Sequence, residues 1–438
     1  MTHYSMYEII DKKKNGELLT KDEIRWVIDS LMNKSIHDYQ MSAFLMACFL
    51  KGLNVEETAY LTDAMLYSGK TLSFEGSNVV DKHSTGGIGD KASFILAPIA
   101  SACGVKVPMI AGRGLGFTGG TVDKIESIPG FKTAIGLDEF QKLLNENNIV
   151  LIGQTEEIAP ADKIIYALRD VTATIDSIPL ITASIMSKKL AEGANGVVMD
   201  IKVGSGAFMR KKADAKKLAK SIIRTAKRFD RKSIALLTNM DQPLGNYVGN
   251  ALEIKESVLT LKGEGPKDLT ELSLALAAHM IHIGGVTKTY NQALKKAKEA
   301  IKSGSAYKEF IKMIDAQGGD TNYVKDLNKL NIAKEVTEIK APKAGWIKSF
   351  KNDEIGLLLI EIGGGRKTKT DKLDLSTGFE FIKKVGDKVE EGETIMKVYH
   401  GVHQVDKVKY IEEKFLSEVV KISKNKVTKP ETIYEIVE

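Results

Sequence analysis

Two glycine-rich segments carry the side chains that could bind an oxyanion. The first runs from Asp81 to Ser93 and the second from Ala111 to Glu126. Backbone N–H groups can converge on an oxyanion only where no Cβ blocks the approach, and both segments combine glycine with hydroxyl and cationic side chains. The pair predicts a site for a tetrahedral anion such as phosphate, with each segment forming one wall.

Neither segment matches a common nucleotide-binding fingerprint. A P-loop ends in Gly-Lys-Ser/Thr, but Lys91 follows Asp90 and precedes Ala92. The spacing from Gly112 to Gly116 lacks the final glycine of a Rossmann fingerprint. These departures disfavour an ordinary nucleotide-binding fold.

The second segment resembles, with one change, the signature of thymidine and pyrimidine-nucleoside phosphorylases, S-G-R-G-L-x-x-T-G-G-T-x-D-K-x-E. The resemblance covers essentially the whole chain. It includes the stretches Lys82–Gly87, Pro160–Lys163, Tyr166–Asp170, Ser184–Lys189 and Gln242–Gly245. It implies a pentosyltransferase that reversibly converts uridine, deoxyuridine or thymidine and inorganic phosphate into the free base and the α-pentose-1-phosphate, without a cofactor.

The resemblance also implies which residues contact the pyrimidine. Arg169, Ser184 and Lys188 would bind the base, and His83 would be a proton donor or hydrogen-bond partner of the leaving base. Breaking the glycosidic bond places negative charge on the departing pyrimidine, so cationic donors suit this position. Ser184 and Lys188 are four residues apart and share one helical face. Asp162 matches a position near the sugar, or it is a charge at a helix N-terminus.

The phosphate ligands implied by the resemblance are Lys82, Ser84, Ser93 and Thr121. Three charged residues of the second segment have two alternative roles. Asp123, Lys124 and Glu126 either contact phosphate or hold their loop by ion pairing.

Two positions depart from the resembled family. Its signature opens with a serine that binds phosphate, whereas this chain has Ala111, so we expect weaker phosphate binding. The family resemblance also implies a potassium site. Its ligand positions here are Gly89, Leu244, Tyr247 and Glu256. A threonine near that site is replaced by Lys91, and we expect its ammonium group to substitute for potassium.

Helices and strands that must position these residues can be located from sequence patterns. Residues 1–67 and 159–192 predict helices, with capping boxes beginning at Thr20 and Asn54 and a break at Pro179. Glycine-bounded β-branched runs predict a parallel α/β sheet. The candidate strands are Val79–Val80, Val107–Ile110, Ile149–Ile152, Val197–Val203 and Ile234–Leu237. Both glycine-rich segments follow strands, where ligands of such sheets bind.

We therefore expect an α/β fold of three parts. A helical, pyrimidine-side domain of residues 1–67 and 159–192 would be hinged to a mixed-sheet phosphate-binding domain of residues 78–155 and 195–335. Residues 340–438 would form a C-terminal barrel-sandwich-like β subdomain, similar to biotinyl and lipoyl carriers but lacking a convincing carrier lysine. Closing the hinge would align the two substrates.

Composition narrows the class of protein. The 438 residues are 43% hydrophobic and 27% charged, which is typical of a globular protein of two or three domains. A net charge of +6 is too small to indicate a nucleic-acid partner. The longest apolar run, Met41–Leu50, is too short to span a membrane. Only Cys48 and Cys103 are present, which favours a reducing, cytoplasmic location. The resemblance implies a homodimer formed through the N-terminal helices.

Two other functions remain open. One is a glycosyltransferase resembling anthranilate phosphoribosyltransferase, which would use a pyrophosphate and magnesium in place of the nucleoside. The other is a non-catalytic nucleoside-binding protein. The first needs acidic magnesium ligands beside the glycine loops, and the second would not need Lys82 or His83.

Overall fold

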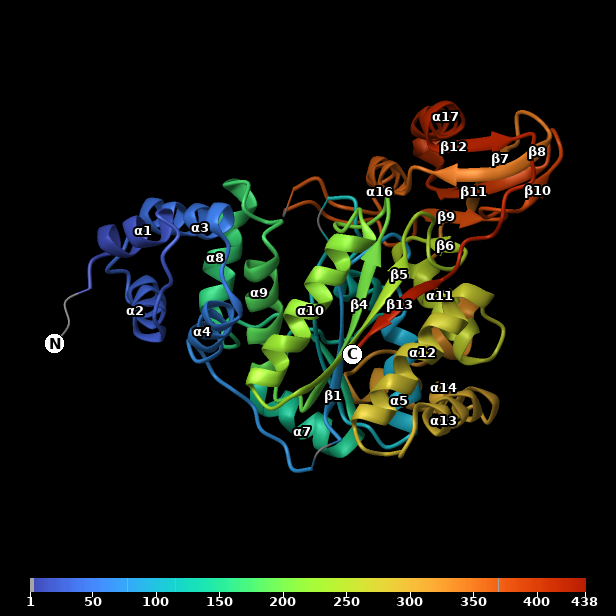
Figure 1. Cartoon of the computed structure of the whole chain (residues 1–438). Helices are drawn as coiled ribbons and strands as arrows, with labels where there is room; N and C mark the ends of the chain where they lie inside the picture. The colour runs from blue at the N-terminus through green and yellow to red at the C-terminus, as the bar shows by residue number, and fades with distance from the viewer. Residues whose placement is uncertain (1–3, 77, 115, 369) are drawn as a thin grey trace.

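The computed structural model describes residues 4–76, 78–114, 116–368 and 370–438, so Leu115 of the signature lies outside the described residues. N-terminal helices form one end of the molecule, a twisted sheet with helices on both faces forms the centre, and a β-rich C-terminal part lies at the other end (Figure 1). No described helix is long and apolar enough to cross a membrane.

The N-terminal end is a helical bundle, as predicted. Its helices are α1 (Met6–Lys14), α2 (Lys21–Met32), α3 (Asp38–Lys51), α4 (Val55–Leu66), α8 (Pro160–Val171) and α9 (Ile178–Ala191). Both predicted capping boxes are present, at Thr20 and at Asn54. One apolar core joins the N-terminal helices to α8 and α9, which come much later in the chain. Ile24 and Val27 of α2 pack in the same core as Ile165 of α8 and Leu180 of α9.

All five predicted strands are present in the centre of the molecule. They are β1 (Val80–Ser84), β2 (Val107–Ala111), β3 (Ile149–Gly153), β4 (Gly196–Val203) and β5 (Lys232–Asn239). The main sheet has the order β1-β4-β5-β13, in which the first three strands are parallel and β13 (Ile433–Val437) is antiparallel to β5. A separate parallel pair, β2 and β3, is joined to it by a bridge between Val79 and Lys106.

The helices of the α/β part cover the central sheet directly or pack on the helices that do. They are α5 (Ser93–Ala102), α6 (Thr121–Ile125), α7 (Leu137–Asn147), α10 (Lys212–Arg228), α11 (Asn250–Leu261), α12 (Lys267–Ile283), α13 (Tyr290–Lys302), α14 (Ser305–Ala316) and α15 (Asn322–Lys325). Alternate residues of β4 enter opposite cores, with Val198 on the α5 and α12 side and Val197 and Met199 on the α10 side. This alternation explains the nearly continuous apolar sequence of the strand.

The C-terminal part contains two small sheets. Its elements are β7 (Glu335–Lys340), β8 (Gly345–Phe350), α16 (Asn352–Glu361), β9 (Gly378–Phe381), β10 (Lys388–Val389), β11 (Thr394–His400), α17 (Val405–Lys414) and β12 (Val420–Ser423). One sheet has the order β10-β8-β12, and the other has the order β6-β9-β11-β7. The short strand β6 (Tyr247–Val248) comes from the α/β part. The three-part domain division stays a prediction, and β6 and β13 cross its boundaries.

Helix α9 belongs to two cores at once. Leu180 and Ala183 in its first half pack in the helical bundle, whereas Met186 and Leu190 in its second half pack against the sheet. The connections between the two parts meet beside its C-terminal end, because Leu72 N–H donates to Ala191 O at 2.7 Å. Helix α9 therefore connects the core of the helical bundle to the core of the central sheet.

Candidate active site

The first glycine-rich segment connects the end of β1 to the beginning of α5. It places Ser84 at the last position of the strand and Ser93 at the first position of the helix. Gly89 has φ +72°, and a Cβ there would lie 2.7 Å from Leu244 O. Only glycine fits both this backbone conformation and this close approach.

Buried charges lie beneath this segment. Lys82 Nζ lies 3.4 Å from Ser93 Oγ and 3.8 Å from a carboxylate oxygen of Asp200. Lys202 pairs with Asp200 at 2.6 Å and with Asp90 at 3.8 Å. Burial alone would raise the pKa of Asp90, but Lys202 and Lys82 outweigh it and lower that pKa. The cluster therefore holds two buried cations next to the hydroxyl groups expected to bind phosphate.

Asp200 and Lys202 are not among the residues expected from the sequence, although a signal was present. Both residues are fully buried in β4, in a run that is otherwise apolar. A charged residue in a buried strand requires a partner, because an unpaired buried charge is costly. Two such residues near the end of a parallel strand indicate a polar site at that edge of the sheet.

The second segment is held mainly by its own ion pairs. Arg113 binds Glu126 through two hydrogen bonds of 2.6 and 2.7 Å and binds Asp123 at 3.0 Å. Asp123 also accepts the Gly114 N–H at 2.7 Å and pairs with Arg366 at 2.7 Å. These contacts favour the loop-holding alternative for Asp123 and Glu126.

Lys124 connects the two glycine-rich segments. Its Nζ donates to Asp90 O of the first segment at 2.8 Å and pairs with Glu253 at 2.7 Å. The two predicted walls therefore lie side by side. Ala111 is the last residue of β2, and Thr121 begins α6. Within the described residues, no hydrogen bond or ion pair connects Thr121 with Lys82.

On the helical side, three of the predicted substrate-binding residues lie together. Lys188 Nζ pairs with Asp162 at 2.5 Å and lies 3.3 Å from Ser184 Oγ, one turn earlier on α9. Asp162 is in the first turn of α8, so both of its alternative roles remain compatible with the geometry. Lys188 is 19% exposed, which leaves its ammonium group accessible from one side.

Arg169 forms its hydrogen bonds with the backbone and not with Lys188, Ser184 or Asp162. Its guanidinium donates to the carbonyl oxygens of Thr174, Ile175 and Leu180 at 2.6 to 3.2 Å. Burial lowers the pKa of Arg169, although nearby Asp162 raises it. Arg169 is only 1% exposed and thus fixes the connection between α8 and α9, using three of its five N–H groups in these bonds.

His83 lies near these helices because α9 is tied to β1. Lys189 pairs with Asp81, which is two residues before His83 and on the same face of the strand. Burial lowers the pKa of His83 well below 6.5, and the charges of Lys189 and Lys188 lower it further. No hydrogen bond to this ring is formed within the described part of the chain. A neutral imidazole can donate one hydrogen bond to a ligand.

The predicted potassium position contains the ammonium group of Lys91. Its Nζ donates to Leu244 O and Tyr247 O at 2.8 Å each and to Glu256 Oε2 at 2.6 Å. The side chain is fully buried. Three oxygen atoms thus surround one nitrogen at hydrogen-bond distance. In the described ranges, no group of three or more His, Cys, Asp or Glu residues could hold a metal ion.

Family models match most of the chain. Residues 7–69 match the helical bundle domain of a glycosyl transferase family, and residues 76–307 match its a/b domain. Residues 346–416 match the pyrimidine nucleoside phosphorylase C-terminal domain. The C-terminal match is specific to one kind of glycosyl transferase, whereas the first two describe the wider family.

Relatives match over nearly the whole length. The chain is 46% identical over 433 residues to pyrimidine-nucleoside phosphorylase of Geobacillus stearothermophilus, covering 98% of this chain and 99% of the relative. The chain belongs to the pyrimidine-nucleoside phosphorylase family. The Bacillus subtilis (strain 168) phosphorylase is 46% identical over 406 residues, covering 92% of this chain and 94% of the relative. These matches confirm the resemblance that the signature predicted.

A more distant likeness concerns the fold alone. The structure of anthranilate phosphoribosyltransferase from Thermus thermophilus aligns with a TM-score of 0.59 and 17% identity. The alignment covers 70% of this chain and 99% of that one. This chain therefore shares the helical bundle and α/β architecture of that structure, in agreement with the predicted fold class.

Proposed function

We propose that the protein catalyses the reversible phosphorolysis of uridine, deoxyuridine and thymidine. The observation that carries the proposal is the position of His83, between the Lys82 cluster and Lys188 of α9, in a member of the phosphorylase family. A phosphate oxygen would attack the anomeric carbon while the carbon–nitrogen bond breaks. The electron pair of that bond leaves with the pyrimidine, which then takes up a proton.

On the phosphate side, we assign the anion to Lys82, Ser84, Ser93 and Thr121. Lys82 provides positive charge and the three hydroxyl groups provide donors, which suits a tetrahedral oxyanion. Ser84 donates to Asp90, a bond that phosphate would have to replace or share. Ala111 provides only its backbone N–H, which supports the proposed weaker phosphate binding.

On the base side, we assign the pyrimidine oxygens to Lys188, Ser184 and Arg169. Lys188 would stabilise the negative charge of the departing base, and Asp162 would orient the ammonium group through their 2.5 Å ion pair. His83 fits the role of hydrogen-bond partner better than that of an acid, because its lowered pKa keeps the ring neutral.

No cofactor is required by this reaction, since inorganic phosphate is itself the nucleophile. We propose that Lys91 takes the place of potassium. Its three oxygen partners, Leu244, Tyr247 and Glu256, are positions at which the resemblance implies potassium ligands, and Gly89 packs directly on Leu244.

The assembly and location are also proposals. Large apolar side chains are exposed on the N-terminal helices, including Tyr7 and Tyr39, which supports a homodimer formed through this end. Cys48 and Cys103 are free thiols, which supports a cytoplasmic location. Pyrimidine nucleosides and phosphate are the expected partners, without nucleic acid or membrane.

The decisive assay follows base release with uridine, deoxyuridine, thymidine and cytidine in parallel, with and without phosphate. We expect phosphate-dependent release from the first three nucleosides. Binding without release would indicate a nucleoside-binding protein. Absence of both, with turnover of a pyrophosphate-activated sugar in magnesium, would indicate the transferase alternative.

A further inference from the structure

The segment of residues 242–247 lies between the α/β part and the C-terminal part. Two of its carbonyl groups accept hydrogen bonds from Lys91, as described above. Two others, those of Pro243 and Gly245, accept hydrogen bonds from Lys384 Nζ, the second at 2.6 Å. One short segment is thus held by two lysines that approach from different parts of the molecule.

Lys384 brings a charge partner to the same place. Its Nζ pairs with Asp268 at 3.1 Å, and Asp268 also accepts the Gly245 N–H at 3.2 Å. The side chains of Lys384 and Asp268 are only 15% and 23% exposed. The ion pair of Lys384 and Asp268 therefore binds two carbonyl groups and one N–H group of the segment.

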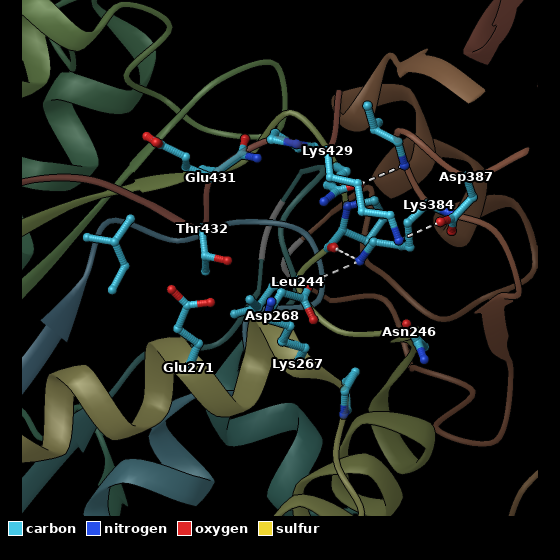
Figure 2. Close-up of a pocket in the computed structure, with 17 residues that line it drawn as sticks. Leu244, Asn246, Lys267, Asp268, Glu271, Lys384, Asp387, Lys429, Glu431 and Thr432 are labelled. Carbon is cyan, nitrogen blue, oxygen red and sulfur yellow. Dashed lines mark hydrogen bonds and ion pairs between the residues drawn. The ribbon is translucent and has the colours of Figure 1, made fainter. Parts of the chain in front are cut away.

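A cavity of about 600 Å³ borders this ion pair. Figure 2 shows Lys384, Asp268 and Leu244 on its wall. Polar contacts hold the segment on the side that faces the cavity, and Leu244 also packs in the apolar core. The C-terminal part adds two more contacts, from Val385 N–H to Gln242 Oε1 at 3.0 Å and from Phe381 N–H to Asn246 O at 2.7 Å.

The same segment supports the first glycine-rich segment. Leu244 N–H donates to Ile88 O at 3.1 Å, and Gly89 approaches Leu244 O so closely that a Cβ would collide. Ile88 and Gly89 lie between the hydroxyl-bearing Ser84 and Ser93. A displacement of residues 242–247 would therefore move the backbone that positions the phosphate ligands.

We propose that Lys384 is a positioning residue for the phosphate site, through which the C-terminal part holds residues 242–247 against the first glycine-rich segment. The inference rests on the proposed function for its kinetic consequence. It gives the C-terminal part a role in the reaction, although no residue of that part belongs to the assigned substrate contacts.

The test compares Lys384→Met with Lys383→Met as a matched control. Lys383 is the preceding residue, and its ion pair with Glu393 stays within the C-terminal part. We expect Lys384→Met to raise the phosphate KM by up to about 100-fold, because small misplacements of binding groups have effects of this size. The nucleoside KM should stay near that of the parent. Amide hydrogen exchange at residues 242–248 should become faster only in Lys384→Met.

Two results would overturn the proposal. One is a folded Lys384→Met protein with the parental phosphate KM and parental exchange at 242–248. The other is an equal change in Lys383→Met, which would indicate a general effect on the C-terminal part. If Lys384→Met does not fold, Asp268→Asn replaces it, with smaller changes expected in the same direction and unchanged values again overturning the proposal. If the parent lacks phosphorolysis, the proposed function fails and the exchange result alone decides whether Lys384 holds the segment.

Discussion

A lysine ammonium group that leaves water needs several oxygen acceptors, and Lys91 has three. Its environment satisfies all three N–H donors with two carbonyl groups and one carboxylate. Removal of one partner from such a buried pair costs about 3–5 kcal/mol, because the other charge stays buried without compensation. The Lys91 position is therefore the residue at which cation dependence can be tested most directly.

For Lys91→Thr, we expect activity and stability that depend on potassium. The variant leaves Leu244 O, Tyr247 O and Glu256 without a cation, and added potassium would restore one. Rates and melting temperatures of desalted parent and variant should be measured in potassium chloride and, as a control for ionic strength, in choline chloride. Strong activation of the parent by potassium would contradict substitution of the ion by Lys91.

For Ala111→Ser, we expect a lower phosphate KM. A hydrogen bond to a charged group contributes about 1.5–3 kcal/mol, which corresponds to a decrease of about tenfold or more. Steady-state rates at varied phosphate measure the effect. Ala134→Ser makes the same chemical change at an exposed position and serves as the control. An unchanged phosphate KM in Ala111→Ser would show that a hydroxyl group at position 111 does not strengthen phosphate binding.

For His83, we expect no kinetic ionisation near pH 6.5. Burial and nearby lysines lower its pKa well below that value, so the ring stays neutral as the pH falls through 6.5. The unfolded chain takes up its proton first, so this group makes folding less favourable as the pH decreases below 6.5. Profiles of kcat against pH for the parent and His83→Gln provide the measurement. An acidic limb centred at 6.5 that is absent from the variant would refute the expectation.

At the scale of elements, a buried ion pair ties the C-terminal end of α9 to β1. Lys189 pairs with Asp81 and, at 3.0 Å, with Glu192. Burial raises the pKa of Glu192 well above 4.5. Burial alone would lower the pKa of Lys189, but the two carboxyl groups outweigh it and raise that pKa. Lys188, the neighbour of Lys189, lies close enough to His83 for its charge to lower the pKa of that ring.

For Lys189→Met, we expect a loss of about 3–5 kcal/mol in the free energy of unfolding, since Asp81 would stay buried without its cation. Denaturant unfolding measures the loss. Lys217→Met removes an exposed pair with Asp214 and should cost at most about 1 kcal/mol. Equal losses in the two variants would mean that the contact with Asp81 contributes little.

Local sequence patterns predicted the individual elements, but they did not predict how distant elements pair. The five central strands and the capping boxes at Thr20 and Asn54 are encoded by neighbouring residues, and all are present. The pairing of β6 with β9 could not be predicted, because a two-residue strand has no period and its partner is distant in sequence. Likewise, the motif predicts that both glycine-rich segments bind phosphate, which stays a prediction. The buried charges of β4 could not be assigned to this place from the sequence, because only the sheet brings Asp200 and Lys202 close to Lys82 and Asp90.

At the scale of the whole molecule, three connections cross between the helical bundle and the sheet at one place. In the segment between α4 and β1, Lys70 N–H donates to Glu157 O at 2.8 Å. Leu72 N–H of the same segment donates to Ala191 O at the end of α9. Ala159, which directly precedes α8, has φ +44°, which is unusual for a residue with a Cβ. These features make the crossing the expected pivot for closure.

We expect phosphate and uracil together to make the molecule more compact than either alone. Each would bind one side of the pivot, and a closed form would be stabilised when both sides are occupied. Small-angle scattering of the protein with each ligand and with both provides the measurement. Identical radii of gyration in all samples would argue against closure about this pivot.

The return of β13 to the central sheet affects how the chain is assembled. The strand follows the whole C-terminal part in chain order, yet it covers the edge of β5, which is made much earlier. A nascent chain would therefore expose an unpaired sheet edge until synthesis has passed the C-terminal part, and such edges favour association with other chains. In topological terms, the C-terminal part is an insertion between two strands of one sheet rather than an appendage, so a chain truncated before this part would also lack an edge strand of the central sheet.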